Sequence, residues 1–102
     1  MSGDLTAVGD ARHAELARRI VSDVLMLPEA EALPERALVA DLGAESIDFL
    51  DLVFRVEEAL GRSVTPSHWQ DFVARELGDH DLAHRITVDV IRRFIARHDV
   101  AP

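Results

Sequence analysis

The chain has 102 residues, 48% of them hydrophobic, and a formal net charge of −8 from 19 acidic residues and 11 arginines, with no lysine. This length and apolar content suit one domain with a modest core, so residues 1–102 are interpreted as a single domain whose residues 1–10 are flexible. The acidic charge disfavours nucleic acid as a partner, and the absence of cysteine excludes disulfides, thiolate metal sites and a protein thiol as nucleophile.

The start of the chain has neither a basic segment nor an apolar run, and no stretch approaches the roughly 20 apolar residues of a membrane span. We therefore expect a cytoplasmic protein without membrane insertion. Both ends look like natural termini, which favours a free-standing protein over a piece of a larger enzyme. Residues 1–60 hold 13 acids and 5 arginines, whereas residues 61–102 hold six of each. A basic partner would be steered to the first 60 residues, although acidic surfaces also serve solubility alone.

The first predicted element is an amphipathic helix over residues 11–27, which Pro28 ends. Its apolar stripe consists of Leu16, Ile20, Val24 and Leu27, with Ala17, Val21 and Leu25 beside it. Residues 28–43 contain two prolines and scattered apolar residues, which predicts a long loop. Its expected anchors in the core are Leu33, Leu38, Val39 and Leu42. A loop of that length in a compact domain usually has a function.

Three further helices are predicted. One spans residues 46–60, and a glycine follows it; the next spans residues 66–77 and begins with the cap pair Thr65 and Pro66. A polar connector over residues 79–85 leads to a last helix, which Thr87 caps and which runs to about residue 98. The fold class is therefore all-α, a four-helix bundle with a long first loop.

The chemically informative segment runs D-L-G-A-E-S-I-D-F-L-D-L-V from Asp41 and continues to Glu58. Gly43 permits a sharp turn, and Ser46 lies at the start of a helix decorated with acids. A serine in that place is usually a simple helix N-cap. No Ser-His-Asp partners lie near Ser46 in the sequence, so this hydroxyl looks like the substrate of another enzyme and not like an activated nucleophile.

This segment resembles the phosphopantetheine attachment site of acyl carrier proteins, where D-L-G is followed by an acid, serine, an aliphatic residue and another acid. Ala44 and Glu45 favour the acyl type over the peptidyl type. The resemblance implies that a phosphopantetheinyl transferase, with coenzyme A and magnesium, attaches 4'-phosphopantetheine to Ser46. It also implies a carrier, not an enzyme, that moves acyl thioesters between enzymes of fatty-acid, polyketide or related biosynthesis.

The resemblance further implies a face that docks on basic patches of acyl-loading, condensing or acyl-transferring enzymes. Its residues are Glu45, Ile47, Asp48, Asp51, Phe54, Glu57 and Glu58. For the acids the alternative is a solvated helix face, and for Phe54 it is core packing. Leu50, Val53 and Val56 are assigned to the core. The protein is expected to be a monomer.

Residues 66–86 exceed the short third helix of the family by about three turns, at 3.6 residues per turn, so an extended third-helix region is expected. Trp69 in this region could fill the core, cover an acyl pocket or contact a partner, and core packing is favoured because tryptophan is mostly buried. Arg55 is unusual on the acidic helix and could alter which partners dock. His80 and His84 have a spacing that metal sites use, but they lie in the polar connector, so no metal site is predicted.

Two other classes of function compete with a carrier. A helical adaptor could bind a protein partner through the acidic helix and never be modified. A small hydrolase could use Ser46, but no general base and no oxyanion arrangement is identifiable in the sequence. Covalent modification of Ser46 separates these hypotheses.

Overall fold

The computed structural model describes residues 2–99, with side chains from residue 10 onward. Its helices are α1 (Ser2–Leu25), the short 3-10 turn η1 (Glu29–Glu31), α2 (Ser46–Leu60), α3 (Pro66–Glu76), α4 (Leu82–Arg85) and α5 (Val88–His98). The all-α fold class is confirmed. Residues 1 and 100–102 lie outside the described residues, and the flexibility of residues 1–10 stays a prediction.

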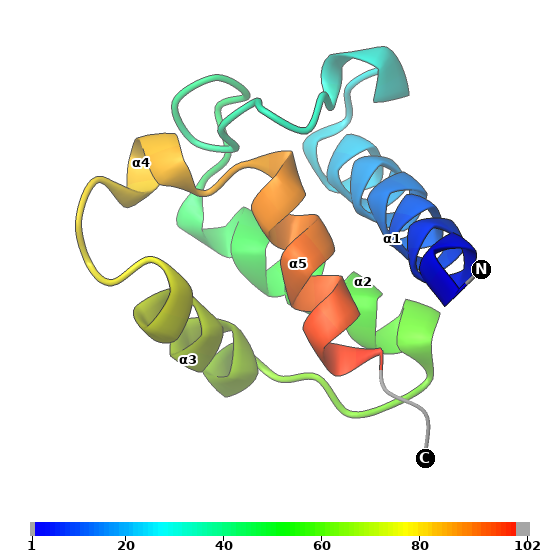
Figure 1. Ribbon diagram of the computed structural model, residues 1–102. Helices are drawn as coiled ribbons and strands as arrows, with labels where there is room; N and C mark the ends of the chain where they lie inside the picture. The colour runs from blue at the N-terminus through cyan, green and yellow to red at the C-terminus, as the bar shows by residue number, and fades with distance from the viewer. Residues whose placement is uncertain (1, 100–102) are drawn as a thin grey trace.

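Four helices, α1, α2, α3 and α5, share one core. Helix α1 packs against α2 and α5, and α3 packs against α2. In Figure 1, α5 lies between α1 and α3, and α2 runs behind it. The largest fully buried side chains are Val21, Leu38, Val56, Ile91, Phe94 and Ile95. They come from α1, α2, α5 and the first loop, so this loop is part of the packed structure.

The predicted helix ends follow from local backbone chemistry. Thr65 and Thr87 each accept a hydrogen bond from the backbone N–H three residues further on, at 3.3 and 3.2 Å, and so cap α3 and α5. Pro66 then occupies the first turn of α3. Gly61 ends α2 with a φ of 67°, a left-handed conformation that glycine adopts without a Cβ clash. These four predictions are confirmed.

Helix α1 differs from its predicted bounds at both ends. It begins at Ser2 and not at residue 11, because no proline interrupts the backbone before Pro28. It ends at Leu25, since Met26 has a φ of 56° and the next N–H turns back to the Ser22 carbonyl at 3.1 Å. The predicted stripe holds: Ala17, Ile20 and Val21 are buried, and Leu16, Val24, Leu25 and Leu27 pack against the core.

The extended third-helix region consists of two helices. The predicted polar connector contains α4, where Leu82 is partly buried against the core. Nη1 of Arg85 donates hydrogen bonds to the carbonyls of Leu77 and His80, at 2.6 and 3.1 Å. The bond to Leu77 satisfies a carbonyl that the end of α3 leaves open, and the bond to His80 stabilises the turn after α3.

Hydrogen bonds hold the loop between α1 and α2 in place. The N–H of Leu38 donates to the carbonyl of Ile86 at 2.9 Å, which ties the loop to the residues between α4 and α5. Leu38 is buried and Leu42 partly buried, but Leu33 and Val39, also predicted as anchors, are 39% and 36% exposed. Several buried side chains and the backbone therefore fix a loop that enters α2 at a defined place.

Candidate functional site

A tight turn delivers the chain to the start of α2. The carboxylate of Asp41 accepts a hydrogen bond from the N–H of Ala37 at 2.8 Å, and Gly43 has a φ of 75°. Ala44 is buried, and its N–H donates to the carbonyl of Leu38 at 2.8 Å. The D-L-G-A sequence therefore fixes the backbone just before Ser46.

Ser46 is the first residue of α2, and it is exposed. Glu45 holds the N-cap position, and its N–H donates to Oδ2 of Asp48 at 2.7 Å. Ser46 is therefore not the N-cap, because its neighbours close the helix start. None of the described side chains forms a hydrogen bond with the Ser46 hydroxyl, which leaves the oxygen free for an external reactant.

The surroundings of Ser46 suit a serine that is esterified to a phosphate better than a serine that acts as the nucleophile of a hydrolase. Within residues 10–99, no imidazole or carboxylate hydrogen bonds to Oγ of Ser46, so no neighbour is placed to take its proton. The N–H groups at a helix N-terminus favour an anion, whereas the carboxylates of Glu45 and Asp48 oppose one. The Asp48 carboxylate is already engaged with the backbone. Phosphopantetheine therefore fits here, with solvent available for its arm.

Three apolar side chains follow Ser46 on the outer face of α2. Ile47 is 68% exposed, and Leu50 and Phe54 are each 55% exposed. The assignment of Leu50 to the core was wrong, whereas that of Val53 and Val56 is confirmed. Leu50 lies three residues after Ile47 and four before Phe54, a spacing that places all three on one helix face and could have identified it. Such exposed apolar groups gain from contact with a partner.

The predicted docking acids lie on α2 or at its N-cap, and they differ in their ion-pair and hydrogen-bond partners within the chain. Asp51 is 3.4 Å from Nε of Arg55, an exposed pair that contributes only about 0.3–0.5 kcal/mol. Asp48 accepts the hydrogen bond at the helix start. Three acids form no ion pair with a described residue: Glu45, Glu57 and Glu58. Their carboxylates remain available to a basic partner.

Trp69 is partly buried and packs against the core, in line with the core packing that the sequence favoured. Its ring stacks on Phe49 of α2 at 5.8 Å between centroids, and Phe94 of α5 meets it edge-on at 5.1 Å. The apolar space that these three helices enclose has no free volume for a water-sized molecule. Trp69 therefore joins α3 to the core.

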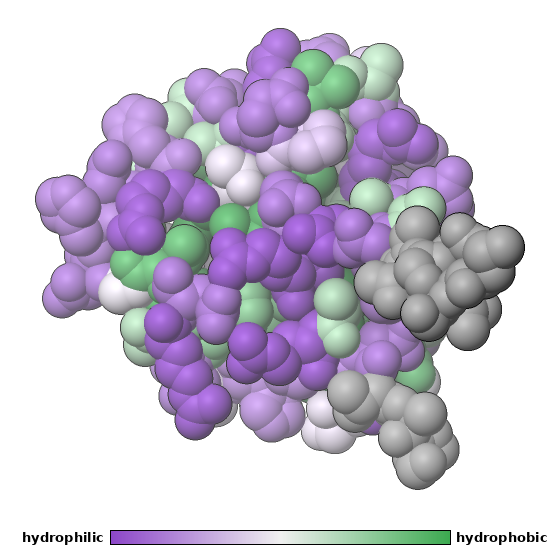
Figure 2. Space-filling model, in the orientation of Figure 1, coloured by the Kyte–Doolittle hydropathy of each residue, from purple (hydrophilic) through white to green (hydrophobic). Residues whose placement is uncertain are grey.

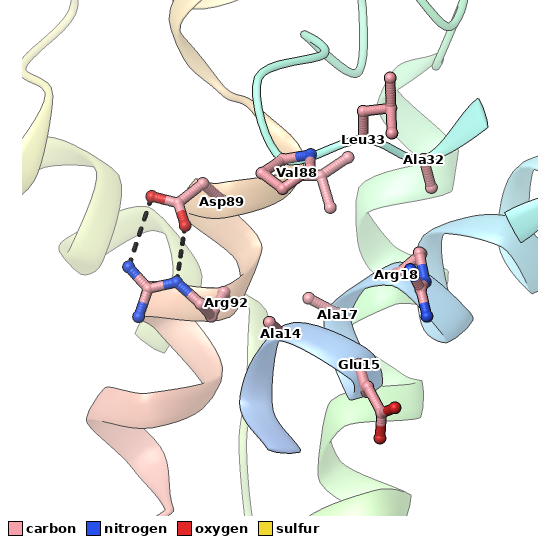
Figure 3. Close-up of a pocket in the computed structure, with 10 residues that line it drawn as sticks. Ala14, Glu15, Ala17, Arg18, Ala32, Leu33, Val88, Asp89 and Arg92 are labelled. Atoms are coloured by element: carbon pink, nitrogen blue, oxygen red, sulfur yellow. Dashed lines mark hydrogen bonds and ion pairs between the residues drawn. The ribbon is translucent and has the colours of Figure 1, made fainter. Parts of the chain in front are cut away.

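A separate pocket of about 120 Å³ lies between α1, the loop after η1 and the start of α5 (Figure 3). Its walls include the buried Ala17, Ala32 and Val88. At its edge, Arg92 donates two hydrogen bonds to Asp89, and this bonding raises the pKa of Arg92. None of its lining residues comes from the segment 41–58, so this pocket is not part of the site around Ser46.

The described part of the chain contains neither a cluster of metal-ligating side chains nor a membrane-spanning helix. No three histidine, aspartate or glutamate side chains there come close enough together to hold a metal ion. His84 instead lies 2.9 Å from Asp81, through Nδ1 and Oδ1. None of the described helices is long and apolar enough to cross a bilayer.

Two comparisons with known proteins bear on this geometry. The model of a protein family described as a phosphopantetheine attachment site matches residues 15–79, well over half of the chain. An acyl carrier protein of Nitratidesulfovibrio vulgaris (strain DP4) is 38% identical to this chain over 47 residues. That alignment covers 46% of this chain and 62% of the relative, which is less than two thirds of the relative's length. The family match includes Ser46 and all of α2 and α3.

Proposed function

Because this chain belongs to the family defined by a phosphopantetheine attachment site, whose members bear a covalent 4'-phosphopantetheine, we propose that Ser46 is the attachment residue. The observation that carries the proposal is the placement of its side chain. Ser46 begins α2, is exposed, and has a hydroxyl that no described side chain engages. The turn over residues 41–44 holds the backbone before it.

The residues around Ser46 present the group and leave the chemistry to partner enzymes. When bound, phosphopantetheine supplies a terminal thiol, which this cysteine-free chain lacks and on which acyl groups are held as thioesters. The helix N-terminus favours the phosphate. Ser46 is exposed at the start of α2, so an arm attached to it would extend into solvent. The function is therefore that of a carrier that exposes acyl intermediates to other enzymes.

The outer face of α2 is the surface that such enzymes would contact. Ile47, Leu50 and Phe54 offer apolar area beside the attachment residue. The carboxylates of Glu57 and Glu58 lie at the far end of the same helix and would steer basic patches toward it. We expect the first partner to be a phosphopantetheinyl transferase. The later partners are acyl-loading, condensing or acyl-transferring enzymes of fatty-acid, polyketide or related biosynthesis, and the carrier acts as a monomer.

Counting thiols tests the proposal, because the unmodified chain has none. After incubation with coenzyme A, magnesium and a broad-specificity transferase, a colorimetric thiol reagent should find one thiol per chain. Ser46→Ala should give none. Ser67→Ala is the matched control, since Ser67 is also exposed in the first turn of a helix, and it should give one. A thiol that persists in Ser46→Ala would place the attachment elsewhere, and its absence from all three proteins would favour an unmodified adaptor.

A further inference from the structure

A second site candidate lies between α3 and α5, on a face that is mainly hydrophilic (Figure 2). A groove of about 310 Å³ is lined there by His68, Asp71, Phe72, Arg75, Arg97 and His98. None of these residues belongs to the segment 41–58 that contains Ser46. The groove exists because α3 runs beside α5, with the imidazoles of His68 and His98 5.3 Å apart between ring centroids.

The hydrogen bonds of His68 fix where its proton lies. Its Nδ1 accepts a hydrogen bond from the backbone N–H of Thr65 at 3.0 Å, as part of the cap of α3. An accepting Nδ1 carries no proton, so the proton of the neutral ring must be on Nε2. His68 therefore offers a donor and no lone pair while α3 remains capped.

His98 has the opposite arrangement. Its Nδ1 is 3.0 Å from the carbonyl of Phe94, and a carbonyl can only accept, so this nitrogen carries the proton. Of the four ring nitrogens of His68 and His98, only Nε2 of His98 has a lone pair free for a metal ion. Both Nδ1 atoms are engaged in hydrogen bonds, and Nε2 of His68 is protonated. The imidazoles therefore disfavour a cation and leave the groove to an anion.

Two arginines add positive charge to this groove. Arg75 forms no ion pair and no side-chain hydrogen bond with a described residue, so its guanidinium is available. Arg97 lies over the ring of Phe72 at 5.7 Å and uses Nη2 for a single bond to Glu76 at 3.1 Å. Guanidinium groups bind carboxylate and phosphate oxygens with two parallel hydrogen bonds. Among the described residues, Asp71 contributes the only carboxylate that lines the groove.

We propose that this groove binds a small organic anion, through a phosphate or carboxylate group held by Arg75, Arg97 and Nε2–H of His68. Its volume is at the lower end of the range for organic ligands, roughly 300 to 1,000 Å³, and exceeds what a bare ion needs. The exposed ring of His68 and the partly exposed ring of His98 provide surfaces for the carbon part of the ligand, whereas the ring of Phe72 is buried beneath Arg97. The site does not depend on Ser46, so a negative result for anion binding in this groove would leave the proposed carrier function unaffected.

Histidine ring signals in NMR spectra provide the test, at one near-neutral pH so that protonation stays constant. Phenyl phosphate and benzoate serve as probes, and they distinguish phosphate from carboxylate as the preferred group. Saturable shifts of the His68 and His98 rings with either probe support the site. Arg75→Ala should weaken binding by about fivefold or more, which corresponds to roughly 1 kcal/mol. Arg12→Ala on α1, with the same change of charge, should leave the affinity unchanged.

Three results would overturn the proposal. One is the absence of saturable shifts with both probes. Another is an equal response to benzyl alcohol, which has a ring but no charge. The third is an unaltered affinity in Arg75→Ala. Arg97→Gln is a second variant, and its binding should also be weaker than that of the wild type. Far-ultraviolet circular dichroism of each variant checks that the total helix content is unchanged.

Discussion

The two faces of α2 carry similar side chains in opposite surroundings. On the inner face, Leu52, Val53 and Val56 are 1–3% exposed. On the outer face, Ile47 and Leu50 are more than half exposed, as is Phe54. The inner face supplies the apolar burial that folds the domain. The outer face leaves a comparable set of apolar groups in water beside Ser46, where folding gains little from them.

This contrast separates stability from recognition within one helix. A buried leucine contributes through the area it removes from water and through the cavity that its loss would leave. An exposed leucine contributes little to folding, and we propose that the apolar side chains on the outer face serve contact with a partner. Substitutions on the inner face should therefore change unfolding and leave recognition intact, and those on the outer face should do the reverse.

The largest expected effect comes from a matched pair of substitutions two residues apart. Leu52→Ala should lower the free energy of unfolding by about 2–5 kcal/mol, because it creates a cavity in the core. Leu50→Ala removes the same atoms from the surface and should change stability by about 0.5 kcal/mol or less. Urea denaturation followed by circular dichroism measures both. Equal losses in the two variants would erase the distinction between the faces.

Trp69→Ala should produce the next largest effect, about 2–3 kcal/mol of unfolding free energy. The ring is only partly buried, so the loss should lie below that of a fully buried aromatic residue. Trp69→Phe preserves the stacking on Phe49 and should recover at least half of this loss. The same urea titration measures both variants. A Trp69→Ala protein as stable as the wild type would show that α3 does not depend on the core.

On the outer face, Phe54→Ala should lower the kcat/KM for modification by a transferase about tenfold, which corresponds to about 1.4 kcal/mol of lost contact. Its stability should stay within about 0.5 kcal/mol of the wild type. Initial rates of coenzyme A incorporation, measured by mass spectrometry, give the first quantity. An unaltered rate with several transferases would count against the outer face as a docking surface.

The smallest expected effect concerns charge. The double substitution of Glu57→Gln and Glu58→Gln should raise the KM for a transferase about two- to threefold at low salt, because steering by exposed charges is weak and screened. The difference from the wild type should shrink as salt is added. The measurement is the same rate assay over a series of salt concentrations. A difference that grows with salt would contradict electrostatic docking.

Local signals in the sequence were sufficient to predict the helix caps and the turn and helix start around Ser46. Thr65, Thr87 and Gly61 act within three or four residues of themselves, so their effects could be predicted without tertiary structure. The position of Ser46 at the start of a helix could be predicted in the same way, because a turn glycine and acidic residues close to it in the sequence determine that position. The role of Ser46 as the attachment residue stays a prediction.

Features that depend on distant contacts could not be predicted in this way. Helix α4 forms because Leu82 reaches the core and Arg85 binds carbonyls at the end of α3 and in the turn that follows it. The position of Leu50 was missed because an apolar residue in a helix was assumed to face inward. The groove beside His68 was missed because it requires α3 and α5 to meet, and its two histidines, His68 and His98, are 30 residues apart in the sequence. Packing between helices decides each of these cases.

The most direct test of the central claim is the intact mass of the protein after incubation with coenzyme A, magnesium and a broad-specificity phosphopantetheinyl transferase. The wild type and Ser67→Ala should each gain the mass of one phosphopantetheine, located on the peptide that contains Ser46, and Ser46→Ala should gain nothing. A gain that survives in Ser46→Ala, or no gain in the wild type with several transferases, would contradict the assignment of Ser46 as the attachment residue.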